Sequence, residues 1–511
     1  MRRSLLVAVL VIFAVLSGCG GGDSGGPPIH PPTNNDPAPD SLSGTVTFKG
    51  TPLPNATVVA FLTNANTVYQ TATTDANGNY TLTGMKSTGN VPGEYQFWVT
   101  KNGYGFYPSV GSGGKVMRWD YTGQFYGNGV TDTAIYFTVI DYQALPDGSL
   151  TSANFAAYDG SAPLVSLGST GQQISYAAGD DGAQRNGLAW TASGRFTDNS
   201  DGTITDSLTG LVWLKNAGCF DPINWFGAVA DANGLASGQC GLTDASSAGQ
   251  WRLPNLNELE SLIDVSASNP ALPANHPFAN VASGIYWTST SYFGGQTGSP
   301  NAWAIRMSDG RYINDSSANA KTTASNAVWA VKGKGIGGSL KLQATGAYVP
   351  FATNDDGSSL MGVPLTFPRW VDNGNGTVTD TMTGLVWLKQ ANCFNSTWSV
   401  ALAAVNLLAS GQCGLTDGSA AGSWRMPNRN EMQSLSDRAQ NNHAAFYSHT
   451  YLSSSNLLYQ AAIFNNFLEL QYYWTSTSDA ANPGAAWTVY SCDFGVYDTP
   501  KSNAGYTLAV R

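Results

Sequence analysis

A long internal repeat constrains this chain of 511 residues more than any other feature. Residues 196–220 read FTDNSDGTITDSLTGLVWLKNAGCF and residues 370–394 read WVDNGNGTVTDTMTGLVWLKQANCF, and sixteen of these 25 aligned positions are identical. Further matches follow in both copies, first WRLPN and WRMPN and then YWTSTS twice. The copies are far longer than the roughly 20 to 50 residues of a solenoid unit. We therefore expect two whole domains, at 169–333 and 344–511.

Each copy alternates between strand signals and helix signals. Short apolar runs separated by Asx-Gly turns predict a β-meander at the start of each copy, and YWTSTS predicts a later strand. Between them, Trp225, Val229 and Ala232 recur at helical spacing. Asn255 and Asn428 each stand three residues before a glutamate, which is the capping-box pattern that begins a helix. This order of strands, helices and strands predicts an α+β fold.

Taken together, the motifs DNxDGTxTDxxTGLVW, WRxPNxxE and YWTSTS resemble the C-terminal domain of the Legionella collagen-like adhesin family. The resemblance implies a C-type-lectin-like α+β fold that binds host glycosaminoglycans through a basic surface. The two copies hold eight and seven Lys+Arg against 13 and 11 Asp+Glu, so their net charges are −5 and −4. That balance argues against glycosaminoglycans and against nucleic acid as partners.

The N-terminus has the pattern of an export signal. Arg2 and Arg3 precede an apolar run of about 12 residues, which is too short to span a bilayer. The run ends in Leu-Ser-Gly-Cys at Cys19, which resembles a bacterial lipobox. The resemblance implies that residues 1–18 are a signal peptide and that Cys19 is lipidated, which would anchor the chain to a membrane. Glycine at the next position favours the outer membrane.

Three segments precede the repeat. Residues 19–40 are a Gly/Pro-rich tether. Residues 41–143 alternate apolar and polar positions between turn signals, which predicts an antiparallel β-sandwich, and their runs GTV, TDANGNY and GEY resemble carboxypeptidase-regulatory-like, transthyretin-type domains. Residues 144–168 read as a linker. The expected fold class is therefore multidomain, an N-terminal all-β sandwich followed by two α+β C-type-lectin-like domains.

The cysteines outside the export signal divide into two pairs and one single residue. Cys219 and Cys240 bracket the first helix of copy one, and Cys393 and Cys413 bracket the first helix of copy two. In an exported protein this duplication predicts one disulfide per copy, worth about 3 kcal/mol in the chain-entropy model. A redox or metal-binding pair is the alternative. Cys492 has a serine as its counterpart in copy one, and we expect it to be a buried free thiol.

Two acidic loops raise the question of calcium. Their glycine comes one place too early for an EF-hand and no glutamate stands at the twelfth position. Asx turns in a hairpin explain the same residues and are the favoured interpretation. Calcium remains the alternative, and the sequence indicates no other cofactor. The candidate ligands are Asp198, Asp201, Asp206, Asp372 and Asp380.

A Glu-Asp-His set recurs at a fixed spacing and could carry acid–base chemistry. It consists of Glu258, Asp264 and His276 in copy one, and Glu431, Asp437 and His449 in copy two. The chain has no GxSxG nucleophile motif, and each glutamate is already explained as a helix cap. We interpret the histidines as structural and expect no catalytic residues. The enzymatic alternative is a relative of formylglycine-generating oxidases, which share the broader fold but use a cysteine pair late in the domain.

Aromatic residues divide into core and surface candidates. Five tryptophan pairs match between the copies and are expected in the core, namely Trp213/Trp387, Trp225/Trp398, Trp251/Trp424, Trp287/Trp474 and Trp303/Trp487. The variable loops are better ligand candidates. In copy one Tyr292, Arg306, Arg311 and Tyr312 could offer stacking and hydrogen bonding to a sugar.

These observations favour a binding protein. We expect a lipid-anchored adhesin or carbohydrate- or protein-binding module on the bacterial outer membrane, with a sandwich spacer and two lectin-like heads, and its ligand a glycan or a surface protein. Linked heads gain avidity even where each binds weakly. The alternative is a structural or assembly component of the envelope that has no soluble ligand.

Overall fold

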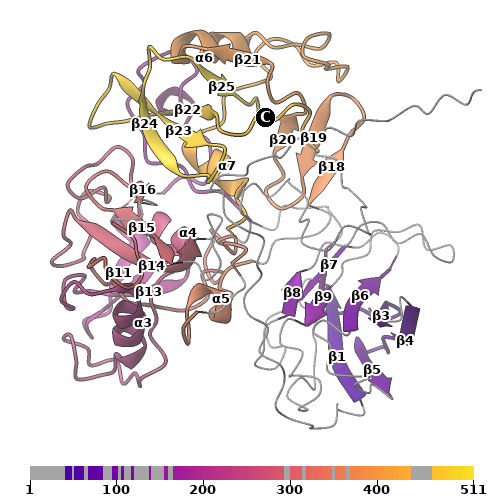
Figure 1. Ribbon diagram of the computed structural model, residues 1–511, viewed down its shortest axis with the longest axis vertical. Coiled ribbons are helices and arrows are strands. Elements are labelled where there is room, and N and C mark those ends of the chain that lie inside the picture. Colours follow the sequence, from indigo (N-terminus) through magenta and orange to yellow (C-terminus); the bar gives the residue numbers. More distant parts are fainter. Residues whose placement is uncertain are drawn as a thin grey trace, which may run out of the picture.

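The computed structural model describes residues 41–48, 51–62, 67–83, 95–101, 105–108, 117–119, 137–139, 155–158, 165–190, 192–292, 300–313, 318–347, 351–363, 369–438 and 463–511. The N-terminal strands, copy one and copy two occupy separate regions of the molecule (Figure 1). Strands dominate all three regions, and the helices are short. Within the described ranges, no helix has the length and apolar character needed to cross a membrane.

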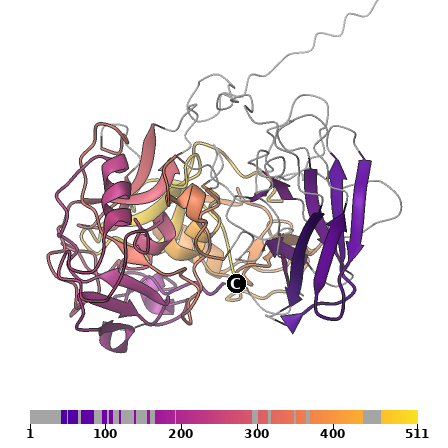
Figure 2. The same ribbon diagram turned by 90° about the horizontal axis from the view of Figure 1, so that it is seen from below.

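The N-terminal region is a β-sandwich, which Figure 2 shows as a layered unit on one side of the molecule. One sheet holds β1 (Ser41–Phe48), β2 (Thr51–Pro52), β5 (Asn79–Thr83), β7 (Gly105–Pro108) and β10 (Phe155–Tyr158), and the other holds β3 (Thr57–Leu62), β4 (Thr67–Thr73), β6 (Tyr95–Thr100), β8 (Met117–Trp119) and β9 (Phe137–Val139). In β5, Tyr80 and Leu82 are buried between exposed neighbours, as period-two alternation requires. The predicted sandwich is therefore present.

One segment of the sandwich lies where a linker was expected. Residues 155–158 form β10, which pairs in parallel with β1 and antiparallel with β7. A segment of the predicted linker, residues 155–158, therefore forms a strand of the N-terminal sheet. The short run Phe-Ala-Ala-Tyr carries too little alternation to be separated from its polar surroundings, and its partners are more than forty residues away in sequence.

Copy one begins with an antiparallel meander and ends with a second sheet. The meander and its partner are β11 (Phe196–Asp198), β12 (Thr203–Asp206), β13 (Leu211–Leu214) and β17 (Val331–Lys332), and the second sheet is β14 (Ile285–Tyr292), β15 (Asn301–Arg306) and β16 (Arg311–Ile313). Between them lie α3 (Trp225–Gly234) and α4 (Leu256–Glu260).

Copy two repeats this plan. Its meander is β18 (Trp370–Asp372), β19 (Thr377–Asp380) and β20 (Val386–Leu388), its helices are α6 (Trp398–Asn406) and α7 (Arg429–Ser434), and its second sheet has the order β21 (Phe394–Ser396), β25 (Gly505–Thr507), β22 (Tyr472–Ser478), β23 (Ala485–Tyr490) and β24 (Val496–Pro500). The α+β organisation expected for each copy is thus observed, with the strands outweighing the helices.

The predicted helix signals are confirmed. α3 buries Trp225, Val229 and Ala232 along one face. α4 and α7 both begin with a complete capping box, in which the side chain of Asn255 or Asn428 accepts a hydrogen bond from the backbone of the glutamate three residues later, and that glutamate bonds back. All ten matched tryptophans are at most 2% exposed, which confirms them as core residues.

Candidate functional site

The two copies are joined by an exchange of loops. Loop A (residues 168–188) lies at the start of copy one and contains α1 (Asp181–Gln184), and loop B (residues 343–363) lies at the start of copy two and contains α5 (Asp356–Ser359). Each loop is closed at its base by backbone hydrogen bonds, from Ser169 to Leu188 (3.0 Å) and from Ala344 to Val363 (2.7 Å). Each is also held from within by a carboxylate that accepts three backbone N–H groups, Asp180 in loop A and Asp355 in loop B.

Loop A docks on copy two, although the repeat assigned its residues to copy one. The Thr477 hydroxyl donates to Asp181 Oδ2 (2.7 Å), and the Ser478 backbone N–H donates to the side-chain oxygen of Gln172 (2.7 Å). The Asn430 amide donates to the carbonyl of Gly168 (2.9 Å). Loop A, the first segment of copy one in sequence, therefore packs on copy two.

Loop B docks on copy one with matching contacts. The Thr290 hydroxyl donates to Asp356 Oδ2 (2.6 Å), and the Asn257 amide donates to the carbonyl of Gln343 (2.8 Å). The Asn233 amide on α3 donates to the carbonyl of Thr353 (2.7 Å). Accordingly, α5 contacts β14 of copy one, and Figure 1 shows α5 at the edge of that copy. Each copy thus receives the loop that belongs to the other.

The repeated motifs build the clefts that receive these loops. The final threonine of each YWTSTS run faces the loop aspartate, and the pairing register of β14 and β22 shifts within this run. In each WRxPNxxE motif, the arginine holds the capping glutamate in a two-point ion pair at 2.6 Å. The asparagine between them caps the helix and also donates to a loop carbonyl. The most similar parts of the two copies are therefore the parts that bind the exchanged loops.

A lysine completes each cleft. Lys321 Nζ donates to the Ser291 hydroxyl (2.7 Å) and lies 3.7 Å from the ring centroid of Phe351 in loop B. Lys501 makes the same contacts to Ser478 (2.8 Å) and to Tyr176 of loop A (4.8 Å). Burial lowers the pKa of Lys321 to about 7. Each loop thus contributes one aromatic ring that covers an ammonium group of the opposite copy.

The loop aspartates are strongly perturbed. Burial raises the pKa of Asp356 to about 7 and that of Asp181 to about 6, and the nearby carboxylates of Glu258 and Glu431 add to these shifts. The threonine hydroxyls that donate to each carboxyl act in the opposite direction. Loop docking therefore includes a carboxyl group that holds a proton at unusually high pH.

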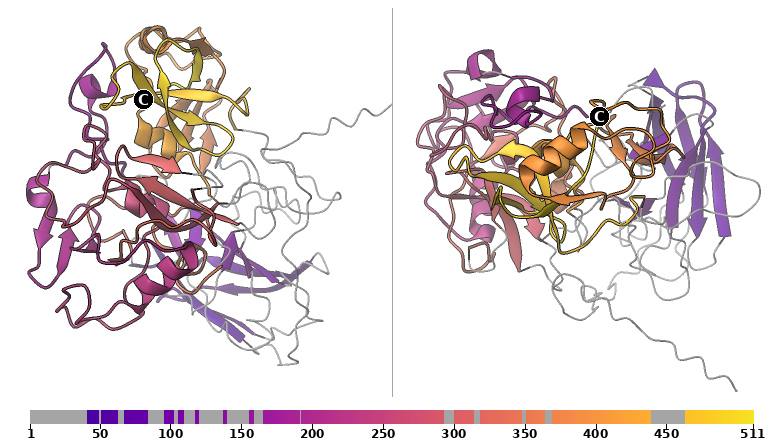
Figure 3. Two further views of the ribbon diagram at one scale, coloured as in Figure 1. Left: turned by 60° about the vertical axis from the view of Figure 1, so that its left-hand side comes forward. Right: turned by 90° about the horizontal axis from the view of Figure 1, so that it is seen from above.

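A second contact between the copies is ionic and lies in the interior. Arg429 on α7 is fully buried and donates to Glu260 on α4 (2.9 Å). Arg438, also fully buried, bonds the carbonyl of Asp493 (2.9 Å) and lies 4.5 Å from the ring of Trp303 in copy one. Figure 3 shows the two copies packed directly against each other.

A pocket of about 100 Å³ opens where the copies meet. Matching residues of the two helices line it, among them Asn257 and Asn430, and Ser261 and Ser434. Their amides donate to loop carbonyls and their hydroxyls donate to helix carbonyls. Because these polar donors are already satisfied, the pocket belongs to the contact between the copies.

The four residues proposed as a ligand surface in copy one lie at or near this contact. Tyr312 is 2% exposed and interacts with Glu260, so it does not present its ring to solvent. Arg311 forms an ion pair with Asp498 of copy two, and Arg306 pairs with Asp309. Tyr292 packs edge-on against Trp303 (5.0 Å). Copy two therefore covers Tyr312 and pairs with Arg311, whereas Arg306 and Tyr292 contact residues of copy one.

The acidic loops form Asx turns, as the favoured interpretation predicted. Asp198 accepts the backbone N–H of Ser200 (3.0 Å) and pairs with Lys215, and copy two repeats these contacts from Asp372. Asp201 likewise accepts the backbone N–H of Thr203. The last aspartates of the loops, Asp206 and Asp380, are buried in ion pairs with Arg195 and Arg369. Among the described residues, no three Asp, Glu, His or Cys side chains are grouped as metal ligands would be.

The Glu-Asp-His set of copy one is not assembled into a reacting group. Glu258 is held by Arg252 and by its helix cap, and Asp264 accepts the backbone N–H and the hydroxyl of Ser266. His276 packs beside Phe278 (5.8 Å), and burial lowers its pKa. His449 of the second set lies outside the described residues.

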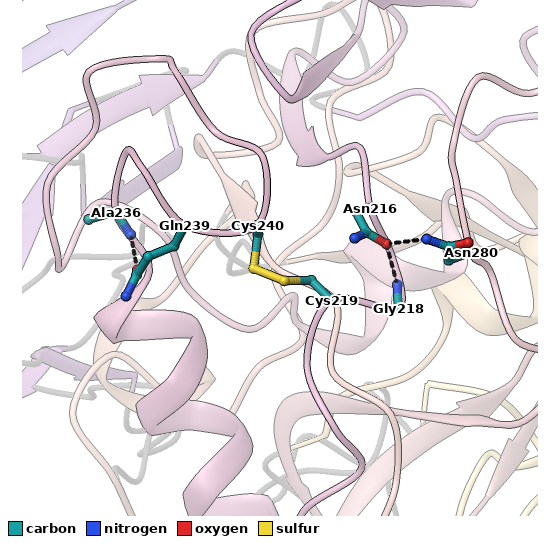
Figure 4. The surroundings of a disulfide bond; sticks show 7 residues. All are labelled: Asn216, Gly218, Cys219, Ala236, Gln239, Cys240 and Asn280. Atoms are coloured by element: carbon teal, nitrogen blue, oxygen red, sulfur yellow. Dashed lines mark hydrogen bonds between the residues drawn. A yellow bond between two sulfur atoms is a disulfide. The ribbon is translucent and has the colours of Figure 1, made fainter.

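Both predicted disulfides are present. Cys219 bonds Cys240 with a Cα–Cα distance of 5.7 Å, and Cys393 bonds Cys413 with 5.9 Å. Around the first, Asn216 accepts from Gly218 and Asn280, and Gln239 accepts from Ala236, so both ends of the bridge lie in bonded turns (Figure 4). Cys492 is disulfide-bonded as well, so the expectation of a free thiol was wrong. Cys19 lies outside the described residues.

Two features were not anticipated from the sequence. One is the exchange of loops, although the repeated Asp-Asp-Gly of α1 and α5 marked both loops as part of the repeat. The other is a cluster of Tyr472, Tyr490 and Tyr497 on three strands of copy two. Tyr490 and Tyr497 are seven residues apart across a hairpin, and no periodicity within one strand could reveal that they meet.

Comparison with known families adds two matches. The model of the Lcl C-terminal domain matches residues 202–332 and 376–511, which together are just over half of the chain. The model of the carboxypeptidase regulatory-like domain matches residues 41–108. No curated protein and no solved structure matches the chain. Loops A and B both fall outside the matched ranges.

Proposed function

The chain belongs to the Lcl C-terminal domain family, and we propose on that basis that it is a non-catalytic adhesin of the bacterial cell envelope. The observation that carries the proposal is the pairing of two copies into one unit by exchanged loops and buried charges. A unit of this kind holds its outer surfaces at fixed positions, which favours simultaneous attachment to a multivalent target.

The rest of the chain supports a role at a surface. The LSGC sequence at Cys19 supports a lipid anchor in the outer membrane, and this anchor requires that the Cys19 thiol is acylated and is not the disulfide partner of Cys492. In that arrangement the tether and β-sandwich would hold the paired copies away from the lipid. The paired copies would adopt a C-type-lectin-like fold and bind glycan or protein. Their net negative charge makes polyanions poor ligands.

Binding to whole cells and to glycans tests this proposal. The purified full-length chain is applied to arrays of neutral and anionic glycans and to host cells, with and without calcium. We expect saturable binding to at least one neutral ligand class. If no glycan and no cell surface binds, and the chain instead purifies with an envelope protein in fixed stoichiometry, the structural role replaces the adhesin.

A further inference from the structure

Three tyrosines gather on the outward face of the second sheet of copy two. Tyr472 on β22 and Tyr490 on β23 are cross-strand partners with ring centroids 4.8 Å apart. Tyr497 on β24 lies 5.9 and 6.3 Å from them with its ring nearly perpendicular to both. Tyr472 is 43% exposed. We call these three residues the tyrosine patch.

The fold does not require tyrosines at these positions. The matching residues of copy one are Ile285, Arg306 and Ile313, on strands with the same pairing. The exposed ring of Tyr472 also gains little from burial, because almost half of its surface remains in water. Exposed aromatic clusters of this kind mark interaction sites more often than they mark core packing.

The rim of the tyrosine patch is polar, and its charges are already paired or negative. The Tyr497 hydroxyl donates to Asp493 Oδ2 (3.2 Å), and Asp498 on the same strand forms an ion pair with Arg311 of copy one. Copy two as a whole carries a net charge of −4. A sulfated or carboxylated ligand would therefore meet repulsion at this site.

We propose that the tyrosine patch binds an uncharged oligosaccharide, an assignment that rests on the proposed adhesin function and gives it a site. A pyranose ring has an apolar C–H face that can lie on an exposed aromatic ring, and hydroxyl groups around its edge. Tyrosine supplies both an apolar face and a hydroxyl, with little side-chain entropy to lose on binding. Tyr490 at 4.8 Å and Tyr497 at 5.9 Å pack against the Tyr472 ring, so its exposed face is held in a fixed position for such a contact.

Binding of neutral oligosaccharides to the full-length chain tests this assignment. The probes are immobilised glucose, mannose, galactose and N-acetylglucosamine oligomers, with heparin as the anionic comparison. Tyr472→Ala removes the exposed ring, and Tyr472→Phe keeps it. Phe226→Ala is the matched control, because Phe226 of copy one is also 43% exposed. Thermal unfolding of each variant verifies that folding is unchanged, as expected for an exposed position.

We expect Tyr472→Ala to weaken binding of a neutral oligosaccharide about tenfold or more, since it removes a central aromatic contact. Tyr472→Phe should retain most of the affinity, and Phe226→Ala should leave it unchanged. Wild-type binding that survives Tyr472→Ala would overturn the tyrosine patch while leaving the adhesin intact. A wild-type chain that binds only heparin, or only a protein, would overturn the patch as well. Absence of any binding would instead count against the adhesin function itself.

Discussion

At the scale of single residues, the two copies differ at two positions where their helices meet. Arg429 and Gln433 on α7 stand where α4 has Leu256 and Glu260, so the ion pair between Arg429 and Glu260 joins a residue of one copy to a residue of the other. Both side chains are largely removed from water, and Arg429 is fully buried. Each of these two charges is therefore accommodated only in the presence of the other.

A double-mutant cycle should show this dependence. Arg429→Leu alone removes the cation that donates hydrogen bonds to the buried Glu260 and should lower the free energy of unfolding by about 3 kcal/mol. The double variant with Glu260→Gln combines leucine and glutamine, the residues at the matching positions Leu256 and Gln433. It should regain most of the lost free energy of unfolding. Urea unfolding of both single variants and the double variant provides the measurement. Equal and additive losses would contradict a direct pairing.

The loop aspartates predict a pH dependence. Asp356 has a pKa of about 7 in the folded protein against an unperturbed 3.8, so between these values the folded state holds a proton that the unfolded state has released. Its contribution to stability therefore falls as pH rises from about 4 to 7. Asp356→Asn keeps an acceptor for Thr290. It should reduce the decrease of the free energy of unfolding over this pH range by up to about 4 kcal/mol.

Unfolding of the Asp356→Asn variant and the wild type at several pH values measures that difference. Asp75→Asn serves as the control, because Asp75 is an exposed turn residue with a lowered pKa. If the free energy of unfolding changes with pH in the same way for the wild type and for Asp356→Asn between about pH 4 and 8, the raised pKa of Asp356 is refuted.

At the scale of elements, the loops depend on close approach of backbone to backbone. A Cβ added to Gly182 in α1 would lie 2.0 Å from the carbonyl oxygen of Ile174, inside loop A. Nothing lies within 4 Å of the corresponding position on Gly234 at the end of α3. The two glycines therefore separate the effect of a clash from the effect of helix propensity.

Gly182→Ala should destabilise loop A and release its contacts with copy two, whereas Gly234→Ala should be neutral or stabilise by up to about 1 kcal/mol. Hydrogen exchange of the backbone of residues 168–188 and of Ser478 reports the docking. Unchanged protection of both segments in Gly182→Ala would show that the loop tolerates the added carbon.

The elements also show what the sequence can and cannot reveal. The capping boxes, the helix of Trp225 and the disulfides were predictable because each depends on residues close together in the chain. The exchange was not, because Thr290 and Thr477 offer the same contact to either loop. The burial of Tyr312 was not predictable either, since the side chains of Arg429 and Arg438 that lie over its ring come from copy two.

At the scale of the whole molecule, the two copies form one closed unit. Copy one receives loop B, copy two receives loop A, and the apolar core of copy one includes Trp487 and Val496 of copy two. The side chains of Tyr176 and Phe351 extend each core into the loop of the opposite copy. Each copy is therefore incomplete without the other, and the repeat unit in sequence differs from the packing unit in space.

Cross-linking across a cut between the copies tests the exchange most directly. A protease site is inserted at exposed Ser339, and cysteines replace Thr353 and Asn233, whose side-chain amide donates to the Thr353 carbonyl in the exchanged arrangement. A matched chain carries cysteines at Thr353 and Asn406, the counterpart of Asn233 in copy two, so that an unexchanged loop B would give a cross-link within the C-terminal fragment.

Both chains are treated with a short bis-maleimide, cleaved, separated under reducing conditions and mapped by mass spectrometry. We predict that the Thr353/Asn233 pair leaves the two fragments covalently joined and that the Thr353/Asn406 pair does not cross-link. Fragments that separate freely in the first chain, together with an internal cross-link in the second, would contradict the exchange.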